Sequence, residues 1–491
     1  MPSLHWSWAA VLAMALLANG IPAQPKAETA DGPISYFKEI RPIFQQNCQG
    51  CHQPAKAQGG YIMTEFAELL KAGETGKPGI VPGKPEQSYL LDEIRVKDGQ
   101  HEMPKNRDAL TAKQYALVER WIKEGAKDDT PASAKEKVTV DEDHPHQYLA
   151  PPVVTSLAFS PNGKYLAVTG YHEVLLHAAD GSKLEARLIG LSEQVRSIAF
   201  SPDGLWLAVA GGSPGRFGEV QIWNVEKRKL KVSTPVTFDT LSGVSWSPDG
   251  KLVAFGCTDN TVRAVDADTG KQLLQMGTHS DWVLTTAFSQ DGLHLVSGGR
   301  DMTVKLTDVP TQRFIDNVTS ITPGALKGGV MTIDRRPMKE KKMQKVPNDT
   351  PGAKPNVYDE ILSAGSDGTP RLYKMHREVK REIGDDSNKL KQFEPMPGRI
   401  SCAKFSPAGD KFAATSSLDG KGEVSVYTIE PAKKLVCEKV SGPAYAVAWS
   451  PDGARIASAG FDGKVWLHDA VSGKLLKEFT AVPITAKTAA K

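Results

Sequence analysis

The sequence has few cysteines, little net charge and no long apolar run after its first residues. Five cysteines in 491 residues are too few for a disulfide scaffold. A formal net charge of +3 is not the strongly basic footprint that nucleic-acid binding requires, so we expect no nucleic-acid partner. No later stretch approaches the roughly 18 apolar residues of a membrane-spanning helix, so we expect no membrane span after processing. A chain this long exceeds one compact core, which indicates at least two domains.

The N-terminal residues have the pattern of an export signal. A short apolar run, WAAVLAMALL, extends from residue 8 to residue 17 and is followed by small residues up to Gln24. Such a run is long enough for a signal peptide and too short to cross a bilayer. No Lys or Arg precedes it, so a retained N-terminal anchor remains an alternative. We predict a signal peptide over residues 1–24 and a periplasmic or otherwise exported protein.

Residues 34–128 are predicted to form a small α-helical domain. The clearest helix is expected over 112–124, because Thr111 and Gln114 form a capping box before its apolar face. Gly125 then follows as a stop signal. The type and spacing of these residues therefore predict both ends of this helix.

Two further helical segments are expected earlier in the same region. Apolar residues recur near helical spacing from Ile34 to Phe44, and Pro42 is expected to start a new turn there. A second, short helix is expected to carry Phe66, Leu69 and Leu70, with Thr64 as its N-cap.

A linker and then a repeated phrase follow this region. Residues 129–150 combine prolines with mixed charge and lack a periodic apolar pattern, so we predict a linker there. From 151 to 482 an aromatic-Ser-Pro-Asp-Gly phrase recurs with small variations between short alternating strands. It occurs at 159–163, 200–204, 246–250, 288–292, 405–409 and 449–453. Proline and glycine in this phrase are typical of a tight turn between two strands.

The spacing of the phrase predicts seven repeats. Its first four serines lie 41 to 46 residues apart, which is the period of a four-stranded propeller blade. The longer gap after Ser289 contains a degenerate repeat, with expected strands at 329–334 and 360–368. A basic, proline-rich insert, 335–356, separates these two strands. Its basic part, Arg335 to Lys345, is either a solvated mobile loop or a docking patch for an acidic redox partner.

The run Cys48-Gln49-Gly50-Cys51-His52 carries the chemistry. Cys-x-x-Cys-His is the attachment signal for c-type haem, because two thioether bonds reach two vinyl groups and the next residue places its imidazole under the iron. A redox cysteine pair or half of a zinc site are the alternatives. Neither needs His52, and no second cysteine pair exists to complete a zinc site. We predict one covalently attached haem c, bound through Cys48 and Cys51 with His52 as an iron ligand.

Both regions resemble known families. Residues 34–126 resemble the planctomycete-type cytochrome c domain, on marks that occur in order: Ile40–Phe44, Gly59-Gly60, Pro82–Glu86 with Ser88 and Leu90, Met103-Pro104, Leu110-Thr111 and Trp121–Ala126. Residues 151–480 resemble the WD40 β-propeller family, on the repeated turns and on Trp223-Asn224, Asp259, His279, Asp301, Asp367 and Asp462. The resemblance implies a multidomain α plus all-β protein, in which a cytochrome c domain precedes a seven-bladed WD40 propeller.

The resemblance also implies the sixth ligand of the haem iron. The candidates within the domain are Met63, His101 and Met103. The family's Met-Pro methionine falls on Met103, although Lys105 stands where a second proline is common. His101 remains the rival, because bis-histidine ligation is common among low-potential haems. We expect Met63 to contribute to packing.

The propeller region offers no catalytic constellation. The resemblance implies that His279 hydrogen-bonds Ser297 and Asp301, and that these residues are structural. Cys257, Cys402 and Cys437 are expected to be free thiols. The other histidines of this region show no metal-binding spacing, so we interpret them as structural or solvated.

These observations favour electron transfer over catalysis. Methionine and histidine together fill both axial positions of a haem, which leaves no site for a small-molecule substrate. The propeller is then expected to serve as a rigid platform for a protein redox partner, by family analogy. Two alternatives remain: a haem-dependent oxidoreductase with a second cofactor in the propeller, and a redox-sensing scaffold.

Overall fold

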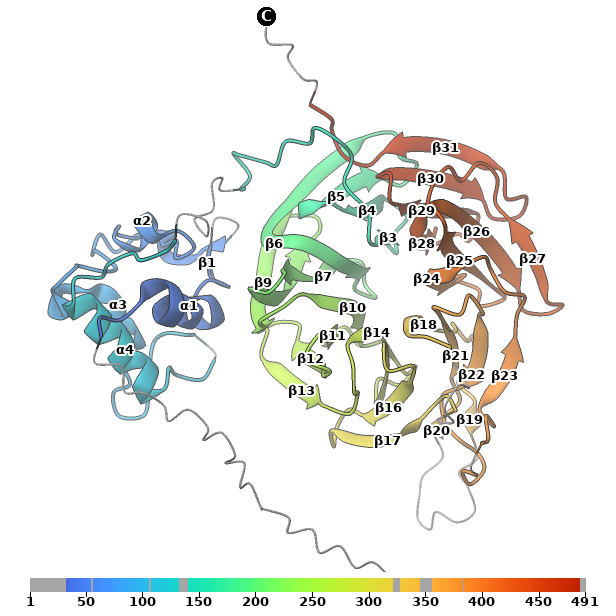
Figure 1. The fold of residues 1–491 in the computed structure, drawn as a ribbon, viewed down its shortest axis with the longest axis horizontal. Coiled ribbons are helices and arrows are strands. Elements are labelled where there is room, and N and C mark those ends of the chain that lie inside the picture. The colour runs from blue at the N-terminus through green and yellow to red at the C-terminus, as the bar shows by residue number, and fades with distance from the viewer. Residues whose placement is uncertain are drawn as a thin grey trace, which may run out of the picture.

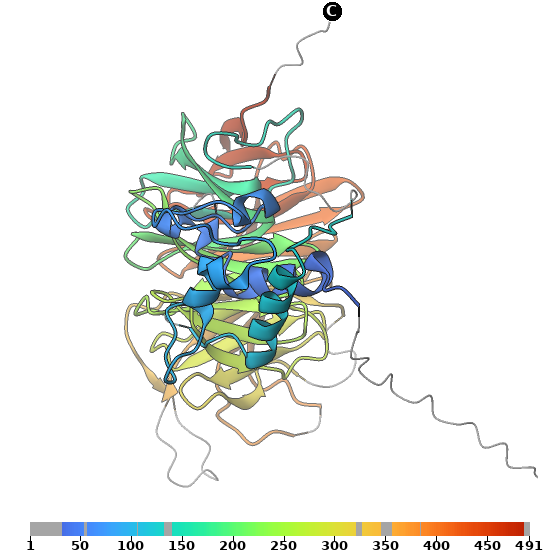
Figure 2. The ribbon, with the colours of Figure 1, turned by 90° about the vertical axis from the view of Figure 1, so that its left-hand side faces the viewer.

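The structure is a computed structural model, and it describes residues 32–53, 56–105, 107–131, 140–320, 327–344, 356–382 and 384–485. The predicted signal peptide lies outside these residues. Figure 1 shows a helical part next to a ring of β-sheets, and Figure 2 shows the helices in front of the rim of that ring. Within the described residues, no helix is long and apolar enough to span a membrane.

The helical part contains short helices around one apolar core. Its helices are a π-helix over Tyr36–Ile40, α1 (Arg41–Asn47), α2 (Phe66–Leu69), α3 (Tyr89–Ile94), α4 (Ala112–Lys123) and two 3₁₀ turns, Gln58–Gly60 and Pro85–Gln87. Two short strands, β1 (His52–Gln53) and β2 (Lys56–Ala57), pair with each other. Pro42 lies in the first turn of α1, which confirms that it starts a new helical segment.

Helix α4 has the predicted capping box. The hydroxyl of Thr111 accepts a hydrogen bond from the Gln114 N–H at 3.2 Å, and the Thr111 N–H donates to the Gln114 side chain at 2.9 Å. The apolar face of α4 is buried, and the Trp121 ring stacks on Tyr36 with 5.4 Å between centroids. The capping box joins residues three positions apart, which explains why the sequence predicted this helix well. The stacking of Trp121 on Tyr36 then fixes the helix in the core.

The predicted N-cap of the second helix is wrong. Helix α2 begins at Phe66, and the chain is extended at Glu65, with φ −111° and ψ 135°. This extended residue separates Thr64 from the N–H groups of the first turn. The Thr64 hydroxyl is buried and has no hydrogen-bond partner among the described residues.

The described part of the β-region contains one seven-stranded sheet, five four-stranded sheets and the small β19–β20 ribbon. The seven-stranded sheet consists of β3 (Leu157–Phe159), β4 (Tyr165–Thr169), β5 (Tyr171–Ala178), β6 (Leu184–Phe200), β7 (Trp206–Ser213), β8 (Phe217–Asn224) and β9 (Lys229–Thr237). The next sheet consists of β10 (Leu241–Trp246), β11 (Leu252–Cys257), β12 (Val262–Asp266) and β13 (Gln272–Met276). It is followed by β14 (Val283–Phe288), β15 (His294–Gly299), β16 (Val304–Asp308) and β17 (Arg313–Asn317).

The remaining sheets continue in chain order. They are β18 (Val330–Arg335) with β21 (Glu360–Gly365), β22 (Arg371–Lys374) and β23 (Lys389–Gln392); then β24 (Arg399–Phe405), β25 (Lys411–Leu418), β26 (Lys421–Thr428) and β27 (Lys433–Val436); and then β28 (Ala444–Trp449), β29 (Arg455–Gly460), β30 (Lys464–Asp469) and β31 (Leu475–Thr480). The ribbon β19 (Met343–Gln344) and β20 (Asn356–Val357) lies between β18 and β21. The insert therefore separates the first two strands of its sheet, as predicted.

The repeated phrase forms a turn between two paired strands, which are β6 and β7 for the copy at 200–204 and the first two strands of a sheet for the other five copies. In one copy, the Ser201 hydroxyl donates to the Asp203 carboxylate at 2.5 Å and accepts from the Trp206 N–H at 3.0 Å. Gly204 has a φ of 73°, a conformation that favours glycine. Ser247, Ser289 and Ser450 make the same bond to the aspartate two residues later. This local hydrogen bonding is the physical basis of the repeat.

The first and last sheets are in contact. Strand β28 packs next to β3, and the Val154 N–H donates to the Gly460 carbonyl at 2.9 Å. Tyr148 and Ile484 form a parallel bridge, and the Thr485 N–H donates to the Tyr148 carbonyl at 2.9 Å. Tyr148 belongs to the predicted linker but is buried in the apolar core that these two sheets share. The chain before β3 thus takes part in joining the two ends of the β-region.

Removing residues 444–491 deletes the last sheet and should destabilise the whole β-region. The deletion uncovers the apolar side chains of the first sheet, including Leu157 and Val168, that pack on β28 to β30. We expect most of this truncated protein to aggregate, as measured by soluble fraction and size-exclusion chromatography. Deleting only 486–491 removes no described contact and is the matched control. Soluble, cooperative folding of the long truncation would contradict the importance of this contact.

Candidate functional site

The cysteine-histidine run lies where α1 changes into β1. Cys48 is the C-cap of α1, and its N–H donates to the Phe44 carbonyl at 2.8 Å. The N–H groups of Cys51 and His52 both donate to the Cys48 carbonyl at 3.1 Å. This turn brings residues 48 to 52 close together. Cys48 is buried, whereas Cys51 and His52 are half-buried.

The imidazole of His52 is oriented by a backbone carbonyl. Its Nδ1 lies 3.1 Å from the Tyr61 carbonyl oxygen, and the Tyr61 hydroxyl in turn donates to the Leu69 carbonyl at 2.7 Å. Such a carbonyl favours the proton on Nδ1, so the ring lone pair is then on Nε2. This is the tautomer that a histidine needs in order to bind a metal through Nε2.

One cavity of about 360 Å³ brings the predicted site residues together. Cys48, Cys51, His52 and Met103 all line it. Apolar side chains complete much of the wall, among them Tyr61, Met63, Leu90, Ile94 and Pro104. The volume and the apolar wall are typical of a site for a cofactor or small molecule.

Glycines allow the chain to fold closely around this cavity. A Cβ atom at Gly79 would lie 2.1 Å from the Tyr61 hydroxyl oxygen. A Cβ atom at Gly73 would lie 2.5 Å from the Gly59 carbonyl oxygen. All three glycines line the cavity, and a larger residue at Gly73 or Gly79 would displace its wall.

The three candidates for a sixth ligand lie in different surroundings. Met103 lines the cavity, and its N–H donates to the Glu93 carbonyl at 2.9 Å. His101 is absent from the described lining, and its Nε2 lies 3.0 Å from the Arg107 carbonyl oxygen. Met63 is fully buried and also lines the cavity, and its N–H donates to the His52 carbonyl at 2.8 Å. The side chain of Met63 therefore contributes to packing as well as to the wall.

Arg107 is a residue of this site that the sequence analysis missed. It lines the cavity, and burial lowers the pKa of its guanidinium, against the opposing effect of the two cysteines. Its Nη2 donates to the Thr234 hydroxyl at 2.8 Å and to the Ser233 carbonyl at 3.4 Å. Both partners lie on β9, far along the chain, so no local pattern could have revealed the contact.

Burial also dominates the chemistry of the cysteines. It raises the pKa of Cys48 to about 12, with a smaller contribution from Cys51, so this thiol is protonated near neutral pH. All five cysteines are unpaired, including Cys257, Cys402 and Cys437, as predicted. In the described part of the chain, no group of three or more His, Cys, Asp or Glu side chains could hold a metal ion.

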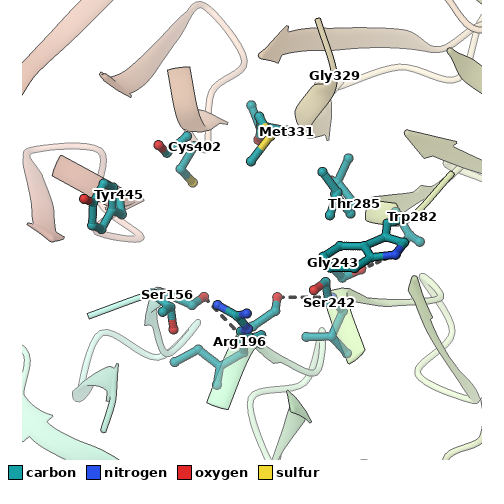
Figure 3. Close-up of a pocket in the computed structure, with 18 of the residues that line it drawn as sticks. Ser156, Arg196, Ser242, Gly243, Trp282, Thr285, Gly329, Met331, Cys402 and Tyr445 are labelled. Atoms are coloured by element: carbon teal, nitrogen blue, oxygen red, sulfur yellow. Dashed lines mark hydrogen bonds between the residues drawn. The ribbon is translucent and has the colours of Figure 1, made fainter. Parts of the chain in front are cut away.

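A second, larger cavity of about 960 Å³ lies at the centre of the ring of sheets. Figure 3 shows Arg196, Met331, Cys402 and Tyr445 around it, each from a different sheet, and Trp282, which directly precedes β14. Its wall also carries Arg300 and Arg399. Arg300 lies over the Trp282 ring, 4.8 Å from its centroid, and Trp282 is 40% exposed.

The basic insert is partly built into the fold. Arg335 pairs with Asp359 at 3.5 Å, and Arg336 pairs with Glu360 at 2.6 Å. Lys339, Lys341 and Lys342 are exposed, and Lys345 lies outside the described residues. Two of the six basic residues therefore have structural partners, which sequence alone could not indicate.

The predicted structural histidine has its expected partners. His279 Nδ1 lies 2.9 Å from the Asp301 carboxylate, and its Nε2 lies 2.8 Å from the Ser297 hydroxyl. The hydrogen bonds confirm this mark of the repeated fold. His294 and His376 lie close together, with ring centroids 4.5 Å apart.

Comparisons with known families match both parts of the chain. The family model described as Planctomycete cytochrome C matches residues 48–107. The model described as WD domain, G-beta repeat matches residues 143–176, 183–216, 270–308 and 433–469, and that of the Anaphase-promoting complex subunit 4 WD40 domain matches 216–288. A cytochrome c-like domain is therefore fused to WD40 repeats in this chain.

Curated relatives resemble the repeats. Actin-interacting protein 1 of Drosophila melanogaster is 42% identical over 81 residues, which are 16% of this chain and 13% of that protein. Protein tipD of Dictyostelium discoideum is 23% identical over 274 residues, which are 54% of this chain and 38% of that protein. WD repeat-containing protein 1 of Gallus gallus is 32% identical over 111 residues, with 19% and 18% covered. The chain thus spans well under half of each of these relatives.

Proposed function

We propose that this chain is an exported monohaem c-type cytochrome that transfers electrons and uses its WD40 sheets as a platform for protein contacts. One observation carries the proposal. Cys48, Cys51, His52 and Met103 line one apolar cavity within a domain that is similar to cytochrome c. These are the residue types that attach a c-type haem and fill both of its axial positions.

The residues of the cavity fit such a group. Cys48 and Cys51 would form the two thioether bonds, with His52 and Met103 as axial ligands. The Tyr61 carbonyl holds the His52 ring in the tautomer that leaves the Nε2 lone pair for iron. The apolar side chains of the wall would pack against the macrocycle and limit its contact with water. A bound haem would supply a one-electron redox couple.

The alternative, an enzyme with a second haem in the propeller, would need an axial ligand near the ring centre. Among the described residues that line the central cavity there is no histidine. Iron content distinguishes the two functions, because an electron carrier needs one iron per chain and this enzyme needs two. We therefore favour the electron carrier.

We infer that the sheets form a closed ring of seven blades. Strand β6 is 17 residues long and pairs with β5 through its first half and β7 through its second, so the seven-stranded sheet supplies two blades. The five other sheets supply one blade each. The contacts between β28 and β3 support closure, and the truncation of residues 444–491 tests it.

We infer that an acidic segment of a protein partner binds at the central cavity. Arg196 and Arg399 line this cavity and have no ion-pair partner among the described residues. Arg300 and the exposed Trp282 lie on the same wall, and arginine with tryptophan is typical of binding hot spots. The basic insert is the second candidate surface, through Lys339, Lys341 and Lys342.

Replacing both cysteines of the motif should abolish covalent attachment. The Cys48→Ala, Cys51→Ala double variant removes both sulfur atoms, so its haem should be extractable into acidified organic solvent. The haem of the unaltered protein should remain with the polypeptide. Extraction of haem from the unaltered protein would show that the attachment is not covalent.

Replacing Met103 by Ala should open the sixth coordination position. We expect loss of the sulfur-to-iron band in the near infrared and binding of carbon monoxide to the reduced protein. His101→Ala is the matched comparison and should leave both properties unchanged, since His101 bonds the Arg107 carbonyl. The reverse pattern, with the change in His101→Ala, would assign the ligand role to His101.

Neutralising Arg196 and Arg399 should weaken binding of an acidic partner. With a labelled oligoglutamate peptide as probe, we expect the Arg196→Ser, Arg399→Ser variant to bind about twofold to thirtyfold more weakly at low salt, because each exposed charge contributes about 0.2–1 kcal/mol. Fluorescence anisotropy measures this. The variant Lys339→Ser, Lys341→Ser, Lys342→Ser tests the insert. A larger loss of binding in this second variant would show that the acidic partner binds at the insert and not at the central cavity.

A further inference from the structure

We propose that docking of the cytochrome c-like domain on β9 is coupled to the oxidation state of its haem, and that Arg107 carries the coupling. The proposal rests on the haem function proposed above. It adds that the WD40 platform contributes to the redox site and responds to it.

The attachment motif itself makes the contact. A Cβ atom at Gly50 would lie 2.1 Å from the Ser233 carbonyl oxygen, so the backbone between the two cysteines lies directly on β9. Helix α1 and strand β2 also contact β9. Figure 1 shows α1 and β1 facing the side of the ring where β9 lies. Only glycine permits this approach, and docking therefore covers the cysteine side of the cavity.

Arg107 connects the cavity with the docked strand. Its guanidinium lines the cavity beside both cysteines and donates to Thr234 and Ser233 on β9. Both partners are neutral, and Arg107 has no carboxylate partner among the described residues. The buried Glu219 is the acidic group behind Ser233, and it accepts hydrogen bonds from Ser192, Gln221 and Ser233. The positive charge of Arg107 is thus not paired with a carboxylate, and Glu93 is the one acidic side chain among the described residues that line the cavity.

The positive charge of Arg107 affects the ferric and ferrous states of the haem differently. A ferric haem carries one more positive charge than a ferrous haem, so a neighbouring guanidinium disfavours the ferric state. The repulsion is stronger when β9 covers Arg107, because water then screens the charges less. Docking therefore raises the reduction potential of the haem. Thermodynamic linkage requires the reciprocal effect, so that reduction tightens docking by the same factor.

The coupling has a definite scale. A tenfold difference in the docking constant between the two oxidation states corresponds to a difference of about 59 mV in potential for one electron. Reduction would hold the domain on the platform, and oxidation would loosen it and uncover the cysteine side of the cavity.

Potentials of full-length variants test the proposal. Arg107→Gln removes the positive charge and should lower the reduction potential by about 59 mV or more, which corresponds to a tenfold change in the docking constant. Arg107→Lys keeps the charge and should retain most of the wild-type potential. Gly50→Val clashes with Ser233 and should lower the potential by undocking, with little further effect in the Arg107→Gln background. Thr234→Val removes the hydroxyl that accepts from Arg107 and donates to the Gly270 carbonyl at 3.2 Å, and it serves if Gly50→Val impairs haem attachment. Arg95→Gln, at an exposed arginine bonded to Tyr115, is the control.

Hydrogen exchange gives a second readout on the same proteins. We expect amides of residues 48–53 and of β9 to exchange faster in the oxidised than in the reduced protein, and this difference should vanish in Arg107→Gln. Equal potentials in all variants, with equal exchange in both oxidation states, would overturn the coupling. A purified protein that binds no haem would instead overturn the proposed function.

Discussion

The contact of the Cys48–His52 turn with its surroundings is the constraint on which the proposed function depends. The end of α1 holds the turn through the Phe44 carbonyl, and the Tyr61 carbonyl orients His52. Gly50 lies against Ser233 of β9 on the other side. The turn is thus positioned by both parts of the chain. A site held in this way is preorganised for a rigid cofactor, because its side chains need little rearrangement to bind.

The same contact relates the two parts of the protein functionally. An independent cytochrome c-like domain on a long tether would leave the cysteine side of its cavity open to any partner. Here β9 and the hydrogen bonds of Arg107 cover that side. A partner that docks on the WD40 sheets would then lie close to the cytochrome c-like domain.

The distribution of charged residues in the sequence has to be reinterpreted once the fold is known. In the sequence, the six basic residues of the insert look like one patch, yet Arg335 and Arg336 pair with Asp359 and Glu360. The arginines of the central cavity are scattered along the sequence, and only the ring of sheets brings Arg196 and Arg399 to one wall. Charge in a sequence therefore indicates a surface only after neighbouring carboxylates are located.

Local interactions explain what could be predicted from the sequence. The capping box of α4 joins residues three positions apart, and the Ser-Pro-Asp-Gly turns close through Ser201 and Asp203, two positions apart. Such bonds depend on nearby residues, so the pattern alone indicated the elements, the repeat and the insert. The prediction that Thr64 is the N-cap of α2 is wrong because the backbone is extended at Glu65, which the sequence pattern around Thr64 did not indicate.

The sequence by itself determined the Cys-x-x-Cys-His motif, because Cys48, Cys51 and His52 lie at a fixed spacing within one turn. It also limited the sixth ligand to a few residues between Met63 and Met103. Only the tertiary structure decided which of them line the cavity, because that depends on how separate segments pack against α3. It alone also brought Arg107 and Gly50 to β9, more than 120 positions away in the chain. No local pattern encodes such a contact, which arises from the packing of two parts that are far apart in the chain.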